Sequence, residues 1–303
     1  MMSNFEQVAC NLCADSNYKV IFPAKYSLEK DKDYALKFRS SGDELLIDQL
    51  VECSKCGLIY INPRLRKDII LDAYSKGEDK VFISQAKARE LTFKKCLNKI
   101  EEFYPQAGKI LDIGTAGGSF LYAAKQSGWE VYGCEPNRWL CEWGRRNYGI
   151  EIKPGDLFQQ NYQQDFFDVV TLWDVLEHTH NPKEVLKECH RILKKNGLLV
   201  VNYPDIGSWI ARIMGRKWVF LLSVHLYYFT PKTINLLLKS SGFSILKIKP
   251  HFQQLTLKYI FSRSKAHSGI IGSMGENISE LLGLGNLNVP YWIGQTLVIA
   301  KKQ

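Results

Sequence analysis

The sequence predicts an α/β protein, in which a mostly parallel sheet carries helices on both faces and follows a small cysteine-rich module. Three observations predict this fold class. Apolar, strand-like segments alternate with helix-like segments from Lys109 to the end of the chain. A glycine-rich turn follows the first of these strands in ILDIGTAGGSFL (110–121), and two C-x-x-C pairs come before position 60. Repeated strand–helix units with apolar strands are typical of parallel sheets that are buried on both faces.

The length and composition of the chain are those of a globular protein. Its 303 residues suffice for one large domain or two modest ones, and 46% hydrophobic and 23% charged residues are ordinary values. The N-terminus lacks the basic start and apolar run of a secretory signal. The most apolar stretch, WVFLLSVHLYYF (218–229), is shorter than the roughly 18 residues that a membrane span needs. We therefore expect a cytoplasmic protein without a transmembrane segment.

The net charge of +9 is unevenly distributed along the chain. Residues 1–104 carry 17 basic and 16 acidic side chains, whereas 206–275 contain ten Lys or Arg and no Asp or Glu. Such an excess is often no more than a solvated surface that keeps a protein soluble. A run of this length without a carboxylate also fits an anionic partner, such as phosphate, nucleic acid or a lipid head group. Both interpretations stay open.

The N-terminal part contains two cysteine pairs at metal-ligand spacing. Cys10 and Cys13 form CNLC, and Cys53 and Cys56 form CSKC. Four thiolates from two such turns complete the tetrahedral shell of a zinc ion and leave no open position for catalysis. In LVECSKCGLIYINP one strand precedes the second pair and another follows it, as in a zinc knuckle, although the gap between the pairs is wide. We predict a structural zinc-ribbon module over 1–65; a redox dithiol and buried free cysteines are the alternatives.

The rest of the chain divides into a helical linker, 66–104, and one α/β domain, 105–303. Residues 14–50 are interpreted as an insertion in the ribbon with a small hairpin. Hydrophobic periodicity in the domain predicts strands at 109–114, 130–135, 167–173, 197–204, 243–250 and 295–302, and helices at 118–127, 137–147, 182–194 and 231–240. An insertion, 206–230, is predicted to form a lid over the substrate.

The glycine-rich turn indicates which nucleotide the domain binds. Its glycines do not match the G-x-G-x-x-G spacing of dinucleotide sites. The charge of Asp112 would repel a pyrophosphate but suits a cationic group, and S-adenosylmethionine (SAM) carries an ammonium and a sulfonium. Glu135 ends the next strand, where an acid accepts hydrogen bonds from ribose hydroxyls, and Asp156 after the third strand could accept one from the adenine amino group. The three acids together favour SAM over a plain tight turn.

These motifs resemble those of a known family. ILDIGTAGGSFL, GCEPN, GD and FDVVTLWDVLEHTHNP are similar, in this order, to the successive motifs of class I SAM-dependent methyltransferases, and RILKKNGLLVV resembles the helix and fifth strand that follow them. The resemblance covers about 109–250 and implies a Rossmann-like, seven-stranded sheet with an antiparallel last strand. It also implies a cofactor site formed by Asp112, Gly114, Gly118, Glu135, Asp156 and Asp174. Ala116 departs from the family pattern, which has glycine there.

Two further segments resemble a subgroup of that family. A four-cysteine ribbon ending in CGLIYINPR, and GRKWVFLLSVHLYYFTP after the fifth strand, look like the sequences of methyltransferases that carry both modules. Some members of the subgroup methylate sugars attached to nucleotides, and others act in glycan or antibiotic assembly. The resemblance therefore implies a small-molecule or carbohydrate acceptor.

Methyl transfer to a hydroxyl or an acidic carbon is assisted by a general base. His178 in DVLEH and His225 in HLYYFT are the candidates, because the pKa of histidine lies near neutrality, and Glu177 is a third. Each of these residues could instead be a packed structural residue. The histidines are the predicted catalytic residues.

Aromatic and basic residues of the predicted lid are candidates for substrate binding. Tyr227 could stack on a sugar or a base, and Arg212, Arg216 and Lys217 could pair with a phosphate. Core packing of the aromatic residue and plain solvation of the charges are the alternatives.

We predict an enzyme that transfers a methyl group from SAM to a small-molecule or carbohydrate acceptor bearing phosphate, such as a nucleotide sugar or a glycan precursor. The alternative is an RNA methyltransferase that holds nucleic acid with its ribbon and basic segment, although the nearly neutral charge of 1–104 argues against it. A non-catalytic SAM-binding protein is disfavoured because the acidic positions are intact. No role is predicted for 266–292.

Overall fold

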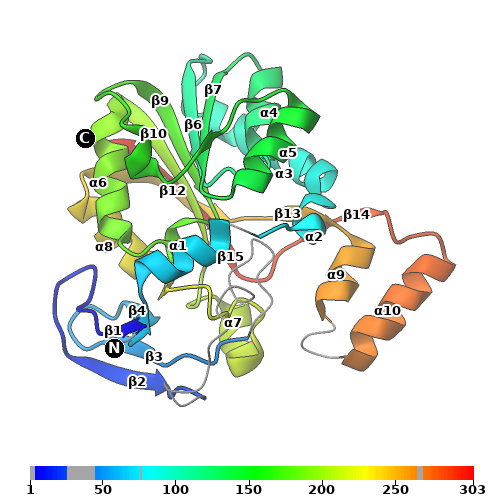
Figure 1. Ribbon diagram of the computed structural model, residues 1–303, viewed down its shortest axis with the longest axis horizontal. Helices are drawn as coiled ribbons and strands as arrows, with labels where there is room; N and C mark the ends of the chain where they lie inside the picture. Colours follow the sequence, from blue (N-terminus) through cyan, green and yellow to red (C-terminus); the bar gives the residue numbers. More distant parts are fainter. Residues whose placement is uncertain (1–3, 26–44, 76, 265–268) are drawn as a thin grey trace.

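The computed structural model of the protein has a seven-stranded sheet at its centre (Figure 1). The structure describes residues 4–25, 45–75, 77–264 and 269–303. In spatial order the strands are β12 (Phe243–Pro250), β15 (Gln295–Lys302), β10 (Leu193–Pro204), β9 (Phe167–Trp173), β6 (Lys109–Ile113), β7 (Glu130–Glu135) and β8 (Lys153–Pro154). All run parallel except β15, which pairs antiparallel with β10 and β12. The expected α/β sheet with an antiparallel last strand is confirmed.

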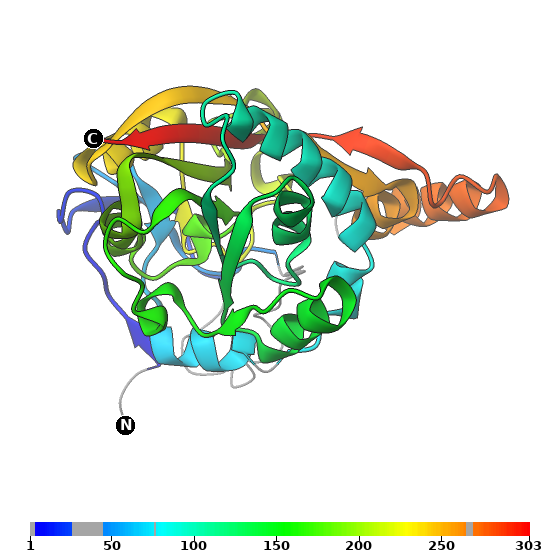
Figure 2. The ribbon, with the colours of Figure 1, turned by 90° about the horizontal axis from the view of Figure 1, so that it is seen from above.

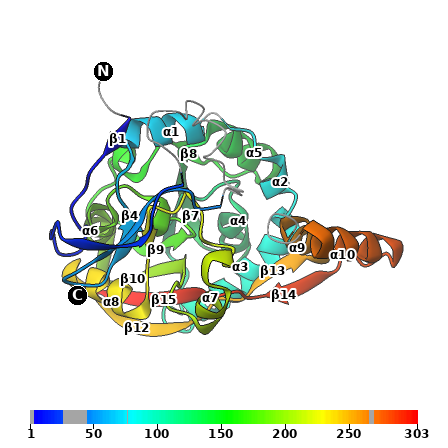
Figure 3. The same cartoon turned by 90° about the horizontal axis from the view of Figure 1, so that it is seen from below.

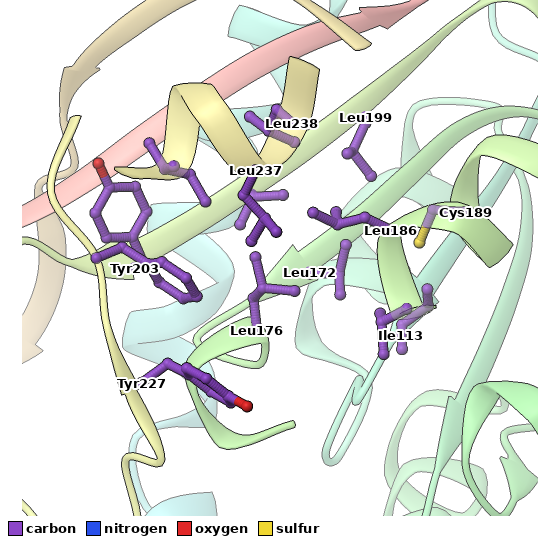
Figure 4. Close-up of a cluster of buried hydrophobic side chains, with 14 of the residues drawn as sticks. Ile113, Leu172, Leu176, Leu186, Cys189, Leu199, Tyr203, Tyr227, Leu237 and Leu238 are labelled. Carbon is purple, nitrogen blue, oxygen red and sulfur yellow. The ribbon is translucent and has the colours of Figure 1, made fainter. Parts of the chain in front are cut away.

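Helices cover both faces of this sheet (Figure 2). The helices of one face are α3 (Ala86–Glu101), α4 (Ser119–Gln126) and α5 (Arg138–Tyr148), and those of the other are α6 (Pro182–Ile192) and α8 (Pro231–Ser240). Successive strand residues point to opposite faces, so that Val169 packs toward α3 and α4, whereas Val170 packs toward α6 and α8. Leu186 of α6 and Leu237 of α8 converge on Leu172 of β9 (Figure 4).

The predicted strands and helices from Lys109 onward are all present, with ends shifted by no more than two residues except at β10. This strand begins at Leu193 and not at 197, because Leu193 already pairs with Phe167 of β9 before an irregularity in the ladder. Asn196 takes a left-handed φ of 65° within that irregularity.

A second, four-stranded sheet holds the N-terminal part of the chain. Its order is β11 (Tyr227–Tyr228), β4 (Ile59–Ile61), β3 (Leu50–Cys53) and β2 (Tyr18–Phe22), and β1 (Phe5–Glu6) pairs separately with β5 (Arg64–Leu65). The predicted strands on either side of the CSKC turn are confirmed. In the predicted insertion 14–50, β2 pairs with β3, and 26–44 lie outside the described residues. Strand β11 comes from the predicted lid, which is therefore tied to this sheet.

Several short helical elements lie in the segments between the strands. The predicted linker contains α1 (Lys67–Ser75) and α2 (Lys80–Ile83) before α3. The segment 206–230 contains α7 (Trp209–Met214), a 3₁₀ turn, η3 (Gly215–Lys217), and β11. Two other 3₁₀ turns, η1 (Leu157–Gln160) and η2 (Leu176–His178), follow β8 and β9.

Between β12 and β15 an arm extends from the body of the molecule (Figure 3). It consists of β13 (Gln253–Thr256), α9 (Leu257–Ser264), α10 (Gly269–Leu281) and β14 (Asn288–Tyr291), with β13 paired antiparallel to β14. The arm includes most of 266–292, of which 265–268 lie outside the described residues. None of the helices in the described ranges combines the length and apolarity that a membrane crossing requires.

Candidate active site

One large cavity of about 750 Å³ lies at the carboxyl ends of the central strands. Three segments line it there: 112–117 after β6, 134–136 at the end of β7 and 173–175 after β9. We call this the strand-end part of the cavity. In open α/β sheets, ligands bind at this edge where the strand order changes direction, here between β6 and β9. The volume falls within the range of about 300–1,000 Å³ that is typical of small-molecule and cofactor sites.

The glycine-rich turn between β6 and α4 brings backbone to the cavity wall. Gly114 and Gly118 have φ angles of 64° and 81°, in the left-handed region that favours glycine. A Cβ on Gly114 would lie 2.7 Å from Cγ2 of Val175, so the packing there also excludes a side chain. Gly118 is the N-cap of α4 and shapes the turn without lining the cavity. Ala116 accommodates a φ of 49° with its small methyl group.

Two buried carboxylates lie in the strand-end part. Asp112 accepts a hydrogen bond of 2.6 Å from the Thr171 hydroxyl. Glu135 accepts hydrogen bonds from the backbone N–H groups of Ala116 at 2.9 Å and Asn137 at 2.8 Å. Burial raises the pKa of both carboxyls to about 7, because the charged form loses its hydration. A ligand that brings hydroxyl donors or a positive charge would restore part of that lost stabilisation.

Asp156 and Asp174 also line the cavity, but other groups already contact them. Asp156 caps η1, where its Oδ1 accepts from the Gln159 N–H at 3.1 Å, and its Oδ2 lies 3.4 Å from the Lys67 ammonium. The two oxygens of Asp174 accept hydrogen bonds from the side-chain amides of Asn202 and Gln253. Asp174 has a left-handed φ of 53°, and its raised pKa reflects burial. These contacts hold the carboxyl groups of Asp156 and Asp174 in defined positions at the cavity wall.

Glu177, His178 and His225 form a cluster in the same cavity. The ring centroids of the two histidines are 4.7 Å apart, and one donor atom of each of the three residues lies within 4.8 Å of the others. Nδ1 of His225 bonds to the Phe220 carbonyl oxygen at 2.9 Å, and Nδ1 of His178 to that of Val224 at 3.0 Å. Because a carbonyl oxygen only accepts, Nδ1 carries the proton in both rings and Nε2 keeps a lone pair.

Burial favours the uncharged forms in this cluster. It lowers the pKa of His178 to about 4, and it lowers that of His225 well below its usual value, with a further contribution from His178. Burial and the charge of Asp174 raise the pKa of Glu177, and neither carboxylate oxygen of Glu177 has a hydrogen-bond partner among the described residues. Such a set can take a proton from a bound molecule, and its donors are also of the kinds that coordinate metal ions.

The structure places the three predicted substrate-binding residues away from the cavity lining. Pairing of β11 with β4 turns Tyr227 into the interface between the sheets, where its hydroxyl accepts from Arg64 at 2.8 Å and donates to the His180 carbonyl at 3.1 Å. The guanidinium of Arg216 lies 4.4 Å from the ring centroid of Phe22. Arg212 interacts electrostatically with Asp205. The expected contact of Tyr227, Arg212 and Arg216 with substrate is therefore corrected, because β11 and its surroundings join the N-terminal sheet.

The sequence prediction missed the opposite wall of the cavity, which we call the arm-side part. It is lined by Phe82, Arg89, Phe93, Leu255, Tyr259, Arg263 and Tyr291. These residues belong to α2, α3, β13, α9 and β14, and no local motif links them. The only signal in the sequence was the lack of carboxylates in 206–275, a run that includes Arg263.

The four predicted zinc ligands lie together in the N-terminal part. Sγ of Cys10 is 3.4 Å from Sγ of Cys56, Sγ of Cys13 is 3.5 Å from that of Cys53, and all four sulfur atoms lie within 4.8 Å of one another. A tetrahedral ion with bonds of about 2.3 Å places its sulfur ligands about 3.8 Å apart. The cluster thus has the donor set and the approximate spacing of a closed zinc site.

Comparisons with known proteins agree with this geometry. A family model described as Methyltransferase domain matches residues 86–248, more than half of the chain. Ubiquinone biosynthesis O-methyltransferase of Coxiella burnetii is 25% identical over 183 residues, which cover 55% of this chain and 77% of that protein. The protein of the same name from Pseudomonas aeruginosa is 32% identical over 135 residues, which cover 42% of this chain and 58% of that protein. A SAM-dependent methyltransferase structure from Archaeoglobus fulgidus, 20% identical, shares the fold with a TM-score of 0.51 over 74% of this chain and 100% of that chain.

The chain belongs to the methyltransferase-domain family and is a SAM-dependent methyltransferase. The predicted enzyme class is confirmed. The zinc ion, the acceptor and the roles of the individual site residues stay predictions.

Proposed function

We propose that this enzyme transfers the methyl group of SAM to a hydroxyl or acidic carbon of a small-molecule or carbohydrate acceptor that bears phosphate, such as a nucleotide sugar or a glycan precursor. The observation that carries the proposal is the cluster of His225, His178 and Glu177, which lies in the same cavity as the strand-end carboxylates. The similarity to two proteins named as O-methyltransferases of ubiquinone biosynthesis supports a small acceptor.

We assign the cofactor to the strand-end part, where the chain offers groups that fit it. The proposed residues that line the cavity are Asp112, Gly114, Glu135, Asp156 and Asp174, and Gly118 shapes the glycine-rich turn from outside the lining. The buried carboxylates of Asp112 and Glu135 suit the ammonium and the ribose hydroxyls, and the glycine turn allows close approach to the backbone. When bound, SAM supplies a methyl group on a sulfonium, which is a good leaving group.

We assign the general base to His225, with His178 as its neighbour in the pair. Burial keeps the imidazole of His225 neutral, so that its free Nε2 lone pair can accept the acceptor's proton, and the lowered pKa makes it a weaker base than a solvated histidine. The imidazolium that results would be buried, and the carboxyl group of Glu177 lies close enough to stabilise it. Because the two ring centroids are 4.7 Å apart, two positive charges would repel strongly, so that only one of the two rings takes up an additional proton at a time.

The segment 206–230 is proposed as the substrate lid. Val219, Phe220, Leu222, Val224 and His225 of this segment line the cavity, and β11 anchors it to the N-terminal sheet. In this proposal, 1–65 is a zinc-ribbon module, 66–104 is a linker and 105–303 is the catalytic domain. The module contacts the start of α6, where the Asn11 side chain donates to Asn181 and accepts from the Lys183 N–H.

The zinc proposal predicts one zinc ion per chain in the purified protein. Cys53→Ser removes one thiolate and should release the ion, loosen the N-terminal sheet and lower the rate of methyl transfer through β11, while SAM affinity stays as in the wild type. Metal analysis of both proteins, together with SAM titration, measures this. Cys189→Ser, which changes a buried cysteine of α6, is the matched control and should retain zinc. Wild-type protein without stoichiometric zinc would contradict the proposal.

The acceptor proposal is tested with purified protein, methyl-labelled SAM and an extract of the source cells. Label that resists nuclease and migrates with small molecules or glycans is the expected result, and the mass of the product identifies the acceptor. A reaction with His225→Gln shows the background labelling. Label in a polymer that nuclease releases would overturn the proposal in favour of an RNA methyltransferase.

A further inference from the structure

The segment 206–230 brings His225 against η2, the 3₁₀ turn that carries Glu177 and His178. Strand β11 of this segment packs on η2, and Nδ1 of His178 bonds to the carbonyl oxygen of Val224, 46 positions further along the chain. The two histidine rings meet at 73°, and one donor atom of each of the three residues lies within 4.8 Å of the others. Two separate segments are therefore needed to complete the cluster.

Backbone carbonyl groups orient both histidine rings. Nδ1 of His178 donates to Val224 at 3.0 Å, and Nδ1 of His225 donates to Phe220 at 2.9 Å. In each ring Nε2 is thus the nitrogen that keeps a lone pair. Histidines that bind metal ions almost always donate their other ring N–H to a carbonyl, a carboxylate or water, which fixes the ring. Both histidines have this orienting contact.

The carboxyl group of Glu177 is buried beside these rings, with the residue only 1% exposed. Neither of its two oxygens has a hydrogen-bond partner among the described residues. Buried carboxylates are normally paired with a cation, hydrogen-bonded or bound to a metal ion, because burial removes their hydration. The neighbouring Asp174 is already occupied, since its oxygens accept from Asn202 and Gln253. Glu177 therefore offers free oxygen donors next to two free ring nitrogens.

We propose that Glu177, His178 and His225 form a binding site for a divalent transition metal ion such as Zn²⁺. Two imidazole nitrogens and one carboxylate oxygen are a donor set that zinc takes in proteins while one position stays open. Bonds of about 2.0–2.2 Å place tetrahedral ligand atoms about 3.4 Å apart, which the spacing of the three donor atoms allows. All three residues line the cavity, so the open position would face it. Mg²⁺, which prefers oxygen ligands, should not bind here.

The site goes beyond the proposed function, and its consequence for the reaction rests on that function. The lone pair on Nε2 of His225 can accept a proton or coordinate an ion, but it cannot do both. A bound ion would therefore prevent His225 from taking the acceptor's proton and would stop methyl transfer until the ion leaves. The enzyme would respond to free zinc through this site and not through the cysteine cluster, whose four thiolates form a closed shell.

Metal binding is measured without SAM or acceptor, by calorimetric titration of the full chain with ZnCl₂. The wild type should bind one ion more than Glu177→Gln and His178→Gln, whatever the cysteine cluster holds, or should bind that ion about tenfold or more tightly than they do. Glu177→Gln keeps the shape of the side chain and removes a buried, unpartnered charge, so it should fold, and circular dichroism checks both variants. His190→Gln, on α6 outside the cavity lining, is the matched control and should bind as the wild type does, and MgCl₂ should give no such binding.

The outcomes separate the metal site from the proposed base. Equal zinc binding by the wild type, Glu177→Gln and His178→Gln would overturn the metal site and leave the proposed function standing, and so would an equal loss in His190→Gln. Initial rates with the identified acceptor test the consequence: zinc should inhibit the wild type reversibly, and about tenfold more zinc should be needed to inhibit Glu177→Gln to the same degree. Zinc that binds at these residues without inhibition would uphold the metal site and contradict the assignment of His225 as the base.

Discussion

The two parts of the cavity are built in different ways. The strand-end part is made of turns that directly follow β6, β7 and β9, and its polar groups are backbone N–H groups and short acids such as Glu135. The arm-side part is made of long side chains from separate helices, such as Arg89 and Arg263. The sheet thus supplies a site at its edge by its topology, whereas segments added to the sheet supply the opposite wall. In sites of this kind, a common fold is combined with loops and added segments that differ between proteins and determine which ligand is bound.

Replacement of His225, which lines the cavity from the lid segment 206–230, should have the largest effect and should leave the strand-end part intact. His225→Gln removes the base but keeps a polar side chain, so kcat should fall by about 10²–10⁴-fold, the usual contribution of general base catalysis. SAM affinity should not change, because the ring of His225 contacts the lid and His178 and is not part of the strand-end part. Initial rates with the identified acceptor and calorimetric titration with SAM measure the two quantities.

A matched control for this experiment is His190→Gln. His190 lies on α6 with its ring 5.5 Å from that of Phe243, and it does not line the cavity. This variant should have the kcat of the wild type. An unchanged kcat in His225→Gln would contradict the assignment of the base, and a parallel loss of SAM affinity would show that the lid and the strand-end part are coupled.

Replacement of Glu135 tests the strand-end part of the cavity. Glu135→Gln puts an amide where a carboxylate accepts two backbone N–H groups, and it removes the charged acceptor for ribose hydroxyls. A hydrogen bond to a charged group contributes about 1.5–3 kcal/mol, so SAM should bind roughly 10- to 100-fold more weakly. Calorimetric titration with SAM measures this.

Glu142→Gln is the matched control, because Glu142 lies on the outer side of α5 and pairs with Arg145 and Arg146. It should bind SAM as the wild type does. The melting temperature of ligand-free Glu135→Gln at pH 8 should change little, because removal of a buried charge is opposed by the loss of an acceptor for one of the two backbone N–H groups. Unimpaired SAM binding in Glu135→Gln would contradict the assignment of the cofactor to this part.

The same contrast explains what could be predicted from the sequence. The strand-end part was predictable because Gly114, Glu135 and Asp174 each lie at the end of an apolar strand or directly after it, and parallel strands bring their ends to one edge. The cysteine cluster was predictable for a similar reason, because each C-x-x-C pair is a local turn. In both cases the backbone determines the position of the functional side chain.

The arm-side part depends on contacts that no local pattern specifies. Arg89 and Arg263 are 174 positions apart, and they line the same cavity because β13, which precedes α9, packs on α3. For Tyr227, the local sequence suggested a contact that the structure does not show. Its aromatic, basic surroundings suggested contact with substrate, whereas pairing of β11 with β4 places it between the sheets. Periodicity predicts which residues are buried, but it does not predict which separate segments pack together.

The smallest expected effect is a pH dependence that differs between cofactor binding and folding. The pKa of Asp112 and of Glu135 is raised to about 7 by burial, so both carboxyls become charged as the pH rises through 7. Because SAM is cationic, its affinity should increase from pH 6 to pH 8, by at most about tenfold over this interval for each group. Methylthioadenosine, which lacks the ammonium and the sulfonium, is the neutral comparison, and its affinity should depend less on pH. In the Asp112→Asn variant, the affinity for SAM should also depend less on pH than in the wild type.

The stability of the ligand-free protein should change in the opposite direction. A carboxyl whose folded pKa lies above its unfolded value contributes stability below the unfolded value, and this contribution is lost as the pH rises through the folded pKa. For Asp112 and Glu135 that window runs from about 4 to about 7. The melting temperature of the free protein should therefore fall across this window more steeply than that of Asp112→Asn, and saturating SAM should offset part of the fall. Equal slopes for the two proteins would mean that Asp112 is charged throughout, and SAM would then bind a carboxylate that is already ionised at pH 6.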